Sequence, residues 1–68
     1  MEFGARLKEL RRAGGLSQSG LAQALGVTLR TVQNYEAGKV LPKRGEIYDL
    51  ASELFGIEPQ ALRRFRKG

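Results

Sequence analysis

The chain has 68 residues, of which 12 are lysine or arginine and 7 are aspartate or glutamate, so its formal net charge is +5. This length allows one domain of marginal stability, because a chain so short buries only about 60% of the surface that its unfolded state exposes. The absence of cysteine and histidine excludes disulfides and the usual zinc sites, and it removes the common nucleophile–base pairs of enzymes. We therefore expect a single non-enzymatic domain over residues 1–68, with no metal and no other cofactor.

The positive net charge favours a polyanionic partner such as nucleic acid. A surplus of ordinary solvated surface charge is the competing interpretation, and charge alone does not decide between the two. No apolar run approaches the roughly 20 residues of a bilayer-spanning helix, and residues 1–4 lack the basic start and apolar block of a signal peptide. We therefore expect a cytoplasmic location without membrane contact.

Apolar residues at helical spacing predict an amphipathic helix over residues 2–13. Phe3, Leu7 and Leu10 recur at intervals of four and three residues, with charged residues between them. The pair Gly14–Gly15 ends this helix, because glycine readily adopts the left-handed conformation found at helix C-termini.

Two short helices follow, with a three-residue connection between them that begins with a glycine. Ser17 is a good N-cap for a helix over residues 18–25, since its hydroxyl can accept a backbone N–H of the first turn. Gly26 ends that helix. The next helix covers residues 29–37 and has a threonine immediately before it as its own N-cap.

The second half of the chain predicts two more helices. One covers residues 44–55, and a fifth begins near Pro59, a residue type that fits the first turn of a helix. The apolar positions that mark the fourth helix are Ile47, Leu50, Ala51 and Leu54. No segment has the period of a strand. The predicted fold is all-α, a compact bundle of five short helices.

The connection between the second and third helices has the features of a helix-turn-helix. Ala22 is small at the point where two short helices would cross, and Gly26 permits the positive φ of a tight turn. An apolar seam joins the two helices, formed by Leu21, Leu25, Val27, Val32 and Tyr35. The combination predicts a motif that places its second helix in the DNA major groove.

The outward face of the third helix carries side chains suited to reading bases. At about 100° per residue, Val32 and Tyr35 share the inner side, and the opposite side carries no acid. Arginine pairs with guanine, glutamine and asparagine pair with adenine, and an apolar side chain can contact the thymine methyl. The predicted base-reading residues are Thr28, Leu29, Arg30, Gln33 and Asn34. An ordinary solvated helix face is the alternative.

The same residues resemble the Cro and lambdoid-repressor type of helix-turn-helix, the XRE family. The likeness covers about residues 3–62 and leaves a basic end at 63–68. It is carried by Gly15-Leu16-Ser17-Gln18, Leu21-Ala22, Leu25-Gly26-Val27-Thr28, Thr31-Val32, Tyr35-Glu36-Ala37-Gly38-Lys39, Pro42 and Leu50-Ala51-Ser52-Glu53-Leu54-Phe55-Gly56-Ile57. The resemblance implies a lambda-repressor-like, five-helix domain whose third helix reads the major groove.

The resemblance also implies two roles close to the DNA. Gln18 would contact a phosphate and brace a recognition side chain, and Arg11 would pair with Glu36 and be oriented toward the DNA backbone. The alternatives are a solvated first-turn glutamine and two independent surface charges. The sequence departs from the family where Lys43 and Arg44 replace the expected Ser or Asp cap of the fourth helix.

Phosphate contacts fix the register of a protein on DNA without reading sequence. The predicted set combines the start of the second helix, the third helix and the cations after it: Ser17, Gln18, Thr31, Lys39, Lys43, Arg44 and Arg11. Plain surface charge is the alternative for each lysine. The basic end over residues 63–68 is more typical of a frayed, solvated terminus.

These observations predict a sequence-specific regulator that binds a double-stranded DNA operator, most simply as a repressor. A homodimer is expected, because one reading helix touches too few bases for high specificity. The predicted dimer interface is the late apolar set Phe55, Ile57, Ala61, Leu62 and Phe65, for which ordinary core is the alternative. The alternative functions are a module that binds an unidentified protein partner and the DNA-binding component of an antitoxin.

Overall fold

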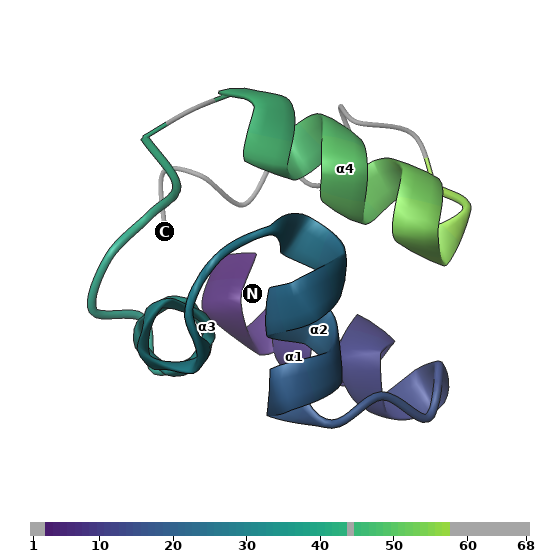
Figure 1. Ribbon diagram of the computed structural model, residues 1–68, viewed down its shortest axis with the longest axis horizontal. Helices are drawn as coiled ribbons and strands as arrows, with labels where there is room; N and C mark the ends of the chain where they lie inside the picture. The colour runs from purple at the N-terminus through teal and green to yellow at the C-terminus, as the bar shows by residue number, and fades with distance from the viewer. Residues whose placement is uncertain (1–2, 44, 58–68) are drawn as a thin grey trace.

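Four helices make up the part of the chain that the computed structural model describes, residues 3–43 and 45–57. In chain order they are α1 (Phe3–Ala13), α2 (Gln18–Leu25), α3 (Leu29–Glu36) and α4 (Gly45–Phe55) (Figure 1). No strand occurs in these ranges. The four predicted helices are thus confirmed to within a residue or two at each end, and the predicted fifth helix lies outside the described residues.

The predicted capping residues begin and end the two helices of the turn motif. The Ser17 hydroxyl oxygen accepts a hydrogen bond from the Gly20 N–H at 2.9 Å, and the Thr28 hydroxyl oxygen accepts one from the Thr31 N–H at 3.1 Å. Gly26, with φ of 71°, ends α2 in the left-handed conformation that other residues rarely adopt. These local interactions fix where the connection between α2 and α3 lies.

The core joins all four helices around three aromatic rings. Phe3 packs edge-on against Tyr35 and Tyr48, with ring centroids 6.2 Å and 5.1 Å apart. Such pairs contribute about 0.5–1.5 kcal/mol each beyond the area that they bury. The buried apolar residues are Phe3, Leu7, Leu21, Ala22, Leu25, Val32, Tyr35, Ile47, Tyr48 and Ala51.

The buried side of α4 agrees only in part with the apolar positions that predicted the helix, since Ile47 and Ala51 are buried and the two leucines are not. Leu50 and Leu54 are each 41% exposed, whereas Tyr48 and Ser52 are buried. The large Tyr48 ring fills the space next to Phe3, which rotates the two leucines outward. Ser52 is tolerated inside because its hydroxyl donates to the Tyr48 carbonyl at 2.6 Å, so no polar group is left unsatisfied at that position.

Close packing of α1 on α3 depends on Gly4. A Cβ atom at this position would lie 2.1 Å from the carbonyl oxygen of Tyr35, which is backbone and cannot move aside. This contact could not be predicted from the sequence, because Gly4 lies inside a helix rather than in a turn. The consequence for function is that α1 holds α3 from its inner side.

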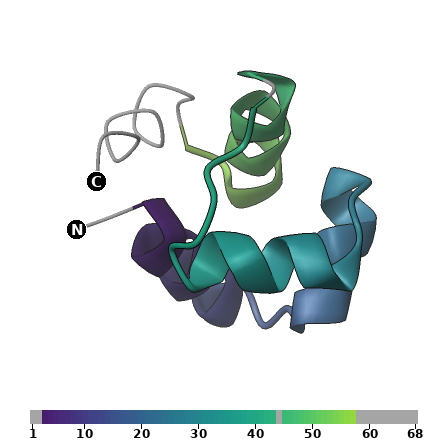
Figure 2. The same ribbon diagram turned by 90° about the vertical axis from the view of Figure 1, so that its left-hand side faces the viewer.

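The four helices leave one side of α3 at the surface. In Figure 1 α4 lies above the other three helices, and α3 is the helix nearest the left edge, where the loop that follows it also lies. In Figure 2, which views that edge, α3 runs across the front with no other described element before it. The position of α3 therefore leaves its outer face open to a large partner.

Candidate nucleic-acid interface

The outer face of α3 is polar and exposed. Arg30 and Gln33 are exposed, Asn34 is half-buried, and Leu29 is 42% exposed, whereas Val32 and Tyr35 face the core. This division is the one that helical periodicity predicted. The arrangement brings the predicted base-reading residues together on one continuous strip, and their contact with bases remains a prediction.

The start of α3 adds two hydroxyl groups to this strip. The Thr28 and Thr31 hydroxyl oxygens lie 2.9 Å apart in a hydrogen bond, and Thr28 also caps the helix. The N-terminus of a helix carries a partial positive charge, because its first backbone N–H groups have no partner within the helix. Both features favour an anionic partner at this end of α3.

The one acidic residue of α3 is turned away from the outer face. Glu36 has a side chain only 3% exposed, and its carboxylate oxygen Oε2 lies 2.6 Å from Nε of Arg11. Arg11 Nη2 donates to the other carboxylate oxygen at 3.1 Å. The ion pair that the family resemblance implied is therefore present, and the negative charge is neutralised inside the domain.

Arg11 has a structural role rather than a surface one. Besides its two bonds to Glu36, its Nη1 donates to the Leu16 carbonyl at 2.8 Å. Only 9% of the residue is exposed. A guanidinium with every nitrogen bonded internally has little surface left for a phosphate, so we leave Arg11 out of the phosphate-binding set that we propose below.

Gln18 connects the buried ion pair to the exposed strip. Its Nε2 donates to Oε1 of Glu36 at 3.1 Å, and its Oε1 accepts a longer hydrogen bond, 3.5 Å, from Nε2 of Gln33. The bracing that the resemblance implied for Gln18 is thus seen, and the braced residue is Gln33. Sequence reasoning named each of these residues but did not link them into one chain of contacts.

The remaining predicted phosphate contacts lie around the ends of α2 and α3. Ser17 is exposed at the start of α2, Thr31 is half-buried in the first turn of α3, and Lys39 and Lys43 are exposed in the loop after it. Arg44 lies outside the described residues. The exposed positions leave both lysines able to meet a DNA backbone that flanks α3.

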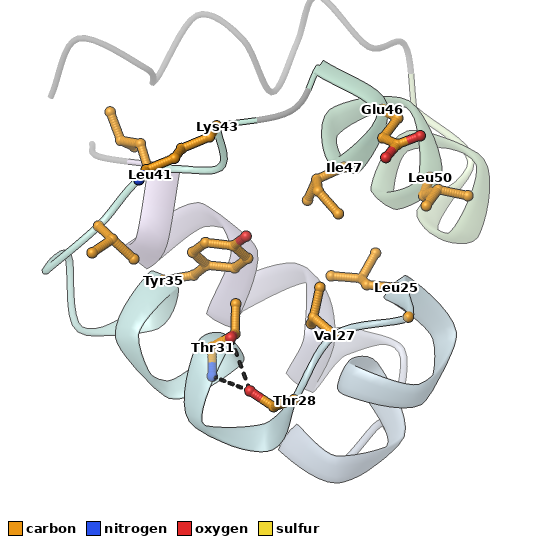
Figure 3. A pocket seen from close by; sticks show the side chains of 12 residues that line it. Leu25, Val27, Thr28, Thr31, Tyr35, Leu41, Lys43, Glu46, Ile47 and Leu50 are labelled. Carbon is orange, nitrogen blue, oxygen red and sulfur yellow. Dashed lines mark hydrogen bonds between the residues drawn. The ribbon is translucent and has the colours of Figure 1, made fainter.

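A groove of about 600 Å³ beside the start of α3 was not anticipated (Figure 3). Leu25, Val27, Tyr35 and Ile47 point into it, while Lys43 and Glu46 lie at its edge. The one signal in the sequence was the apolar pair Val40–Leu41 in a loop, and both residues are about as exposed as Leu50. Its mostly apolar lining suits packing rather than catalysis. The full lining is Leu25, Gly26, Val27, Thr28, Thr31, Tyr35, Val40, Leu41, Lys43, Glu46, Ile47 and Leu50.

The predicted dimer residues are only partly described. Phe55 and Ile57 are half-buried and pack against the core cluster, which is the alternative interpretation of these two positions. Ala61, Leu62 and Phe65 lie outside the described residues. Leu54, one of the apolar positions that predicted the fourth helix, is exposed next to Phe55.

Two structural features are absent from the described residues, 3–43 and 45–57. No group of three or more aspartate, glutamate, cysteine or histidine side chains lies close enough to hold a metal ion in these ranges. None of the described helices combines the length and the apolar character that crossing a membrane requires.

The fold and the site together define a helix-turn-helix DNA-binding domain: a glycine turn sets α3, whose exposed face carries no acid, against the supporting helix α2. A family model described as a helix-turn-helix domain matches residues 2–65. The chain therefore belongs to the helix-turn-helix domain family, in its Cro/CI-type form, and is a DNA-binding protein of the transcription-regulator class.

One solved structure that the chain resembles is the restriction-modification controller protein C.AhdI from Aeromonas hydrophila. The two sequences are 37% identical, the match covers 88% of this chain and 86% of that one, and the TM-score is 0.76. No curated protein sequence matches the chain.

Proposed function

We propose that this protein is a sequence-specific transcriptional regulator that places α3 in the major groove of its operator and acts as a repressor. The observation that carries the proposal is the exposed strip of α3, which holds Arg30 and Gln33 at the surface while Glu36 is turned inward and neutralised. Duplex DNA presents the complementary surface, because its phosphates are negative and its base edges offer paired donors and acceptors.

Within this proposal the strip reads bases by residue type. Arg30 would pair with O6 and N7 of a guanine, and Gln33 and Asn34 would each pair with an adenine. Leu29, exposed at the first position of α3, would contact a thymine methyl, and Thr28 would reach a neighbouring base edge or phosphate.

The phosphate contacts in the proposal flank the strip on both sides. The Ser17 cap and Gln18 lie at the start of α2, and the two loop lysines follow α3. Contacts of this kind would fix the register of α3 in the groove and supply the salt-dependent part of the affinity. The proposed set is Ser17, Gln18, Thr31, Lys39, Lys43 and Arg44.

Site selection from a random duplex pool tests the proposal. The expected result is one enriched site, bound at least a hundredfold more tightly than random duplex at moderate salt, in keeping with the about 10³-fold or greater ratios of specific regulators. Equal affinity for selected and random DNA at every salt concentration would contradict it.

We also propose that the protein binds its operator as a homodimer. Two copies of α3 related by a two-fold axis would read half-sites about 34 Å apart. The end of α4 supports this, because Leu54 is exposed there beside the half-buried Phe55 and Ile57. We place the interface on this end of α4 and on Ala61, Leu62 and Phe65. Sedimentation that shows one copy per operator duplex at saturation would contradict the dimer.

The similarity to C.AhdI, which is a restriction-modification controller protein, supports a proposal about the target genes. We propose a controller role of the same kind here, with an operator near the genes of a restriction-modification system. Binding of the protein to DNA upstream of its own gene would support this, and a selected site absent from that region would contradict it.

A protein-binding module is the second candidate function, and the apolar groove beside α3 is the observation that favours it. Titration with random duplex at low salt separates the two candidates. A positively charged DNA-binding domain binds random duplex in a salt-dependent manner, whereas a protein-binding module would show no such binding.

A further inference from the structure

We propose that Glu36, although buried away from the DNA, determines which base Gln33 reads. It does so by fixing the direction in which two successive side-chain amides point. This inference rests on the proposed function, because it requires that α3 reads base edges. Its test is arranged so that the two proposals fail in different ways.

The first step is the direction of the Gln18 amide. A carboxylate can only accept hydrogen bonds, so the group that faces Glu36 has to be a donor. Gln18 accordingly turns its Nε2 toward Oε1 of Glu36, at 3.1 Å. The opposite direction would bring the amide oxygen of Gln18 against a carboxylate oxygen, two acceptors with no proton between them.

In the second step, the orientation of the Gln18 amide determines the orientation of the exposed Gln33 amide. With its nitrogen facing inward, Gln18 presents its oxygen Oε1 to Gln33, and this oxygen accepts from Gln33 Nε2 at 3.5 Å. The amide nitrogen of Gln33 is thereby held toward Gln18. The direction of an exposed side chain on α3 is thus set by Glu36, whose own side chain is 3% exposed.

The third step concerns the hydrogen-bonding groups of Gln33 that remain available to a base. A glutamine amide has two N–H donors and one oxygen acceptor, and Gln18 uses one of the donors. The other N–H and the oxygen remain on the outer edge of Gln33. One donor beside one acceptor is complementary to adenine, which presents the N7 acceptor and the N6 donor in the major groove.

If both glutamine amides were turned around, Gln33 would read a different base. If Gln18 presented its nitrogen to Gln33, the Gln33 oxygen would be occupied and two N–H donors would remain outward. Two donors suit guanine, whose N7 and O6 are both acceptors. The choice between adenine and guanine at one base pair therefore follows from the acceptor-only character of Glu36.

Arg11 fixes the position of the Glu36 carboxylate that orients Gln18. Its bonds at 2.6 Å and 3.1 Å hold both carboxylate oxygens of Glu36 in a bidentate pair. Bidentate pairs of this kind fix the orientation of both partners. The ion pair thus acts as a positioning element for the reading surface as well as a structural contact.

The experiment compares the wild type with Glu36→Gln, Gln18→Ala and Gln33→Ala. Site selection with the wild type and Gln33→Ala identifies the base pair that Gln33 reads. Dissociation constants are then measured for duplexes that carry adenine or guanine at that pair. The wild type should prefer adenine about tenfold, in the range of one bidentate base contact.

In Glu36→Gln the new amide can donate to the oxygen of Gln18, so the Gln18 amide can turn around and present its nitrogen to Gln33. The adenine preference should therefore fall to about twofold or less, or change to guanine. Preferences at the other base pairs should not change. Gln18→Ala, which leaves the Arg11–Glu36 pair intact, should also lose the adenine preference, and it keeps the test valid if Glu36→Gln does not fold.

The matched control is Ile47→Val, which loosens the core without touching this chain of contacts. It should keep the wild-type adenine preference, because a general loss of stability lowers all affinities alike. The inference is overturned if a folded Glu36→Gln keeps the wild-type ratio, if Gln18→Ala keeps it, or if Gln33→Ala changes no base preference. Each of these results leaves the proposed function standing, whereas a wild type that selects no sequence overturns both proposals.

Discussion

Helices α3 and α4 both bury one side and expose the other, yet their exposed sides differ in charge. The outer side of α3 carries Arg30 and Gln33 and no acid, since Glu36 is turned inward. The outer side of α4 carries Glu46, Asp49 and Glu53, all exposed. A phosphate backbone would be attracted to the first surface and repelled by the second.

This difference in charge separates two kinds of surface within one small fold. The acid-free side of α3 suits DNA, and the acidic side of α4, with its exposed Leu50 and Leu54, suits contact with protein. The net charge of +5 does not contain this information, because it averages over both faces.

The largest expected effect comes from breaking the ion pair that keeps α3 free of surface acid. Arg11→Met should lower the free energy of unfolding by about 3–5 kcal/mol, because it leaves the Glu36 carboxylate buried without its partner. Urea denaturation followed by circular dichroism measures this. The matched control is Arg12→Met, at an exposed position on the same turn, which should change stability by less than about 0.5 kcal/mol. Equal effects would contradict a buried pair.

The next effect comes from the support of α3 by α1. Gly4→Ala should destabilise the domain by about 2–3 kcal/mol, because a Cβ atom there would overlap the Tyr35 carbonyl and push α3 outward. Gly14→Ala is the control, since its Cβ atom would meet only ordinary contacts of 3.4 Å and beyond. Thermal unfolding of the two variants under one condition decides the point, and a stable Gly4→Ala would show that α1 and α3 do not pack as closely as described.

One substitution on the exposed side of each helix tests whether α3, and not α4, contacts the operator. Arg30→Ala should weaken binding to the selected operator about tenfold or more and weaken random-duplex binding much less, because a guanine contact carries sequence information. Glu53→Ala on α4 should leave operator affinity unchanged or slightly improved. Fluorescence anisotropy with labelled duplexes gives both dissociation constants. A larger loss for Glu53→Ala than for Arg30→Ala would reverse the roles of the two helices.

The proposed dimer contact at the end of α4 has its own test. Leu54→Glu should weaken the homodimer, because it places a charge at the centre of the proposed interface. The expected result in sedimentation is a shift toward monomer, with operator affinity reduced and single half-site affinity retained. Lys8→Glu, at an exposed position on α1, is the control and should leave the oligomeric state unchanged.

The smallest effect concerns the loop between the two helices. Lys43→Ala should weaken operator and random duplex alike and reduce the slope of log affinity against log salt by about one contact. A loss restricted to the operator would give Lys43 a base-reading role instead.

Sequence reasoning succeeded where structure is set by neighbours along the chain. Ser17, Gly26 and Thr28 act through hydrogen bonds and backbone conformations within a few residues, so the turn and the exposed face of α3 followed from spacing alone. These features make up most of the fold and most of the candidate reading strip.

Sequence reasoning failed where contacts join distant segments. The need for Gly4 depends on a carbonyl in another helix, and the burial of Tyr48 instead of Leu50 depends on space beside Phe3. The chain of contacts from Glu36 to Gln33 spans three helices when Arg11 is included. The groove beside α3 likewise forms only when a loop and α4 close over the turn.

Methylation interference on the selected operator tests the central assignment, the major-groove placement of α3, most directly. Methyl groups at guanine N7 lie in the major groove, where Arg30 would bind. We predict that methylation at one guanine per half-site blocks binding of the wild type and that Arg30→Ala is insensitive at that guanine alone. Binding that tolerates N7 methylation at every guanine of the operator would contradict the placement of α3.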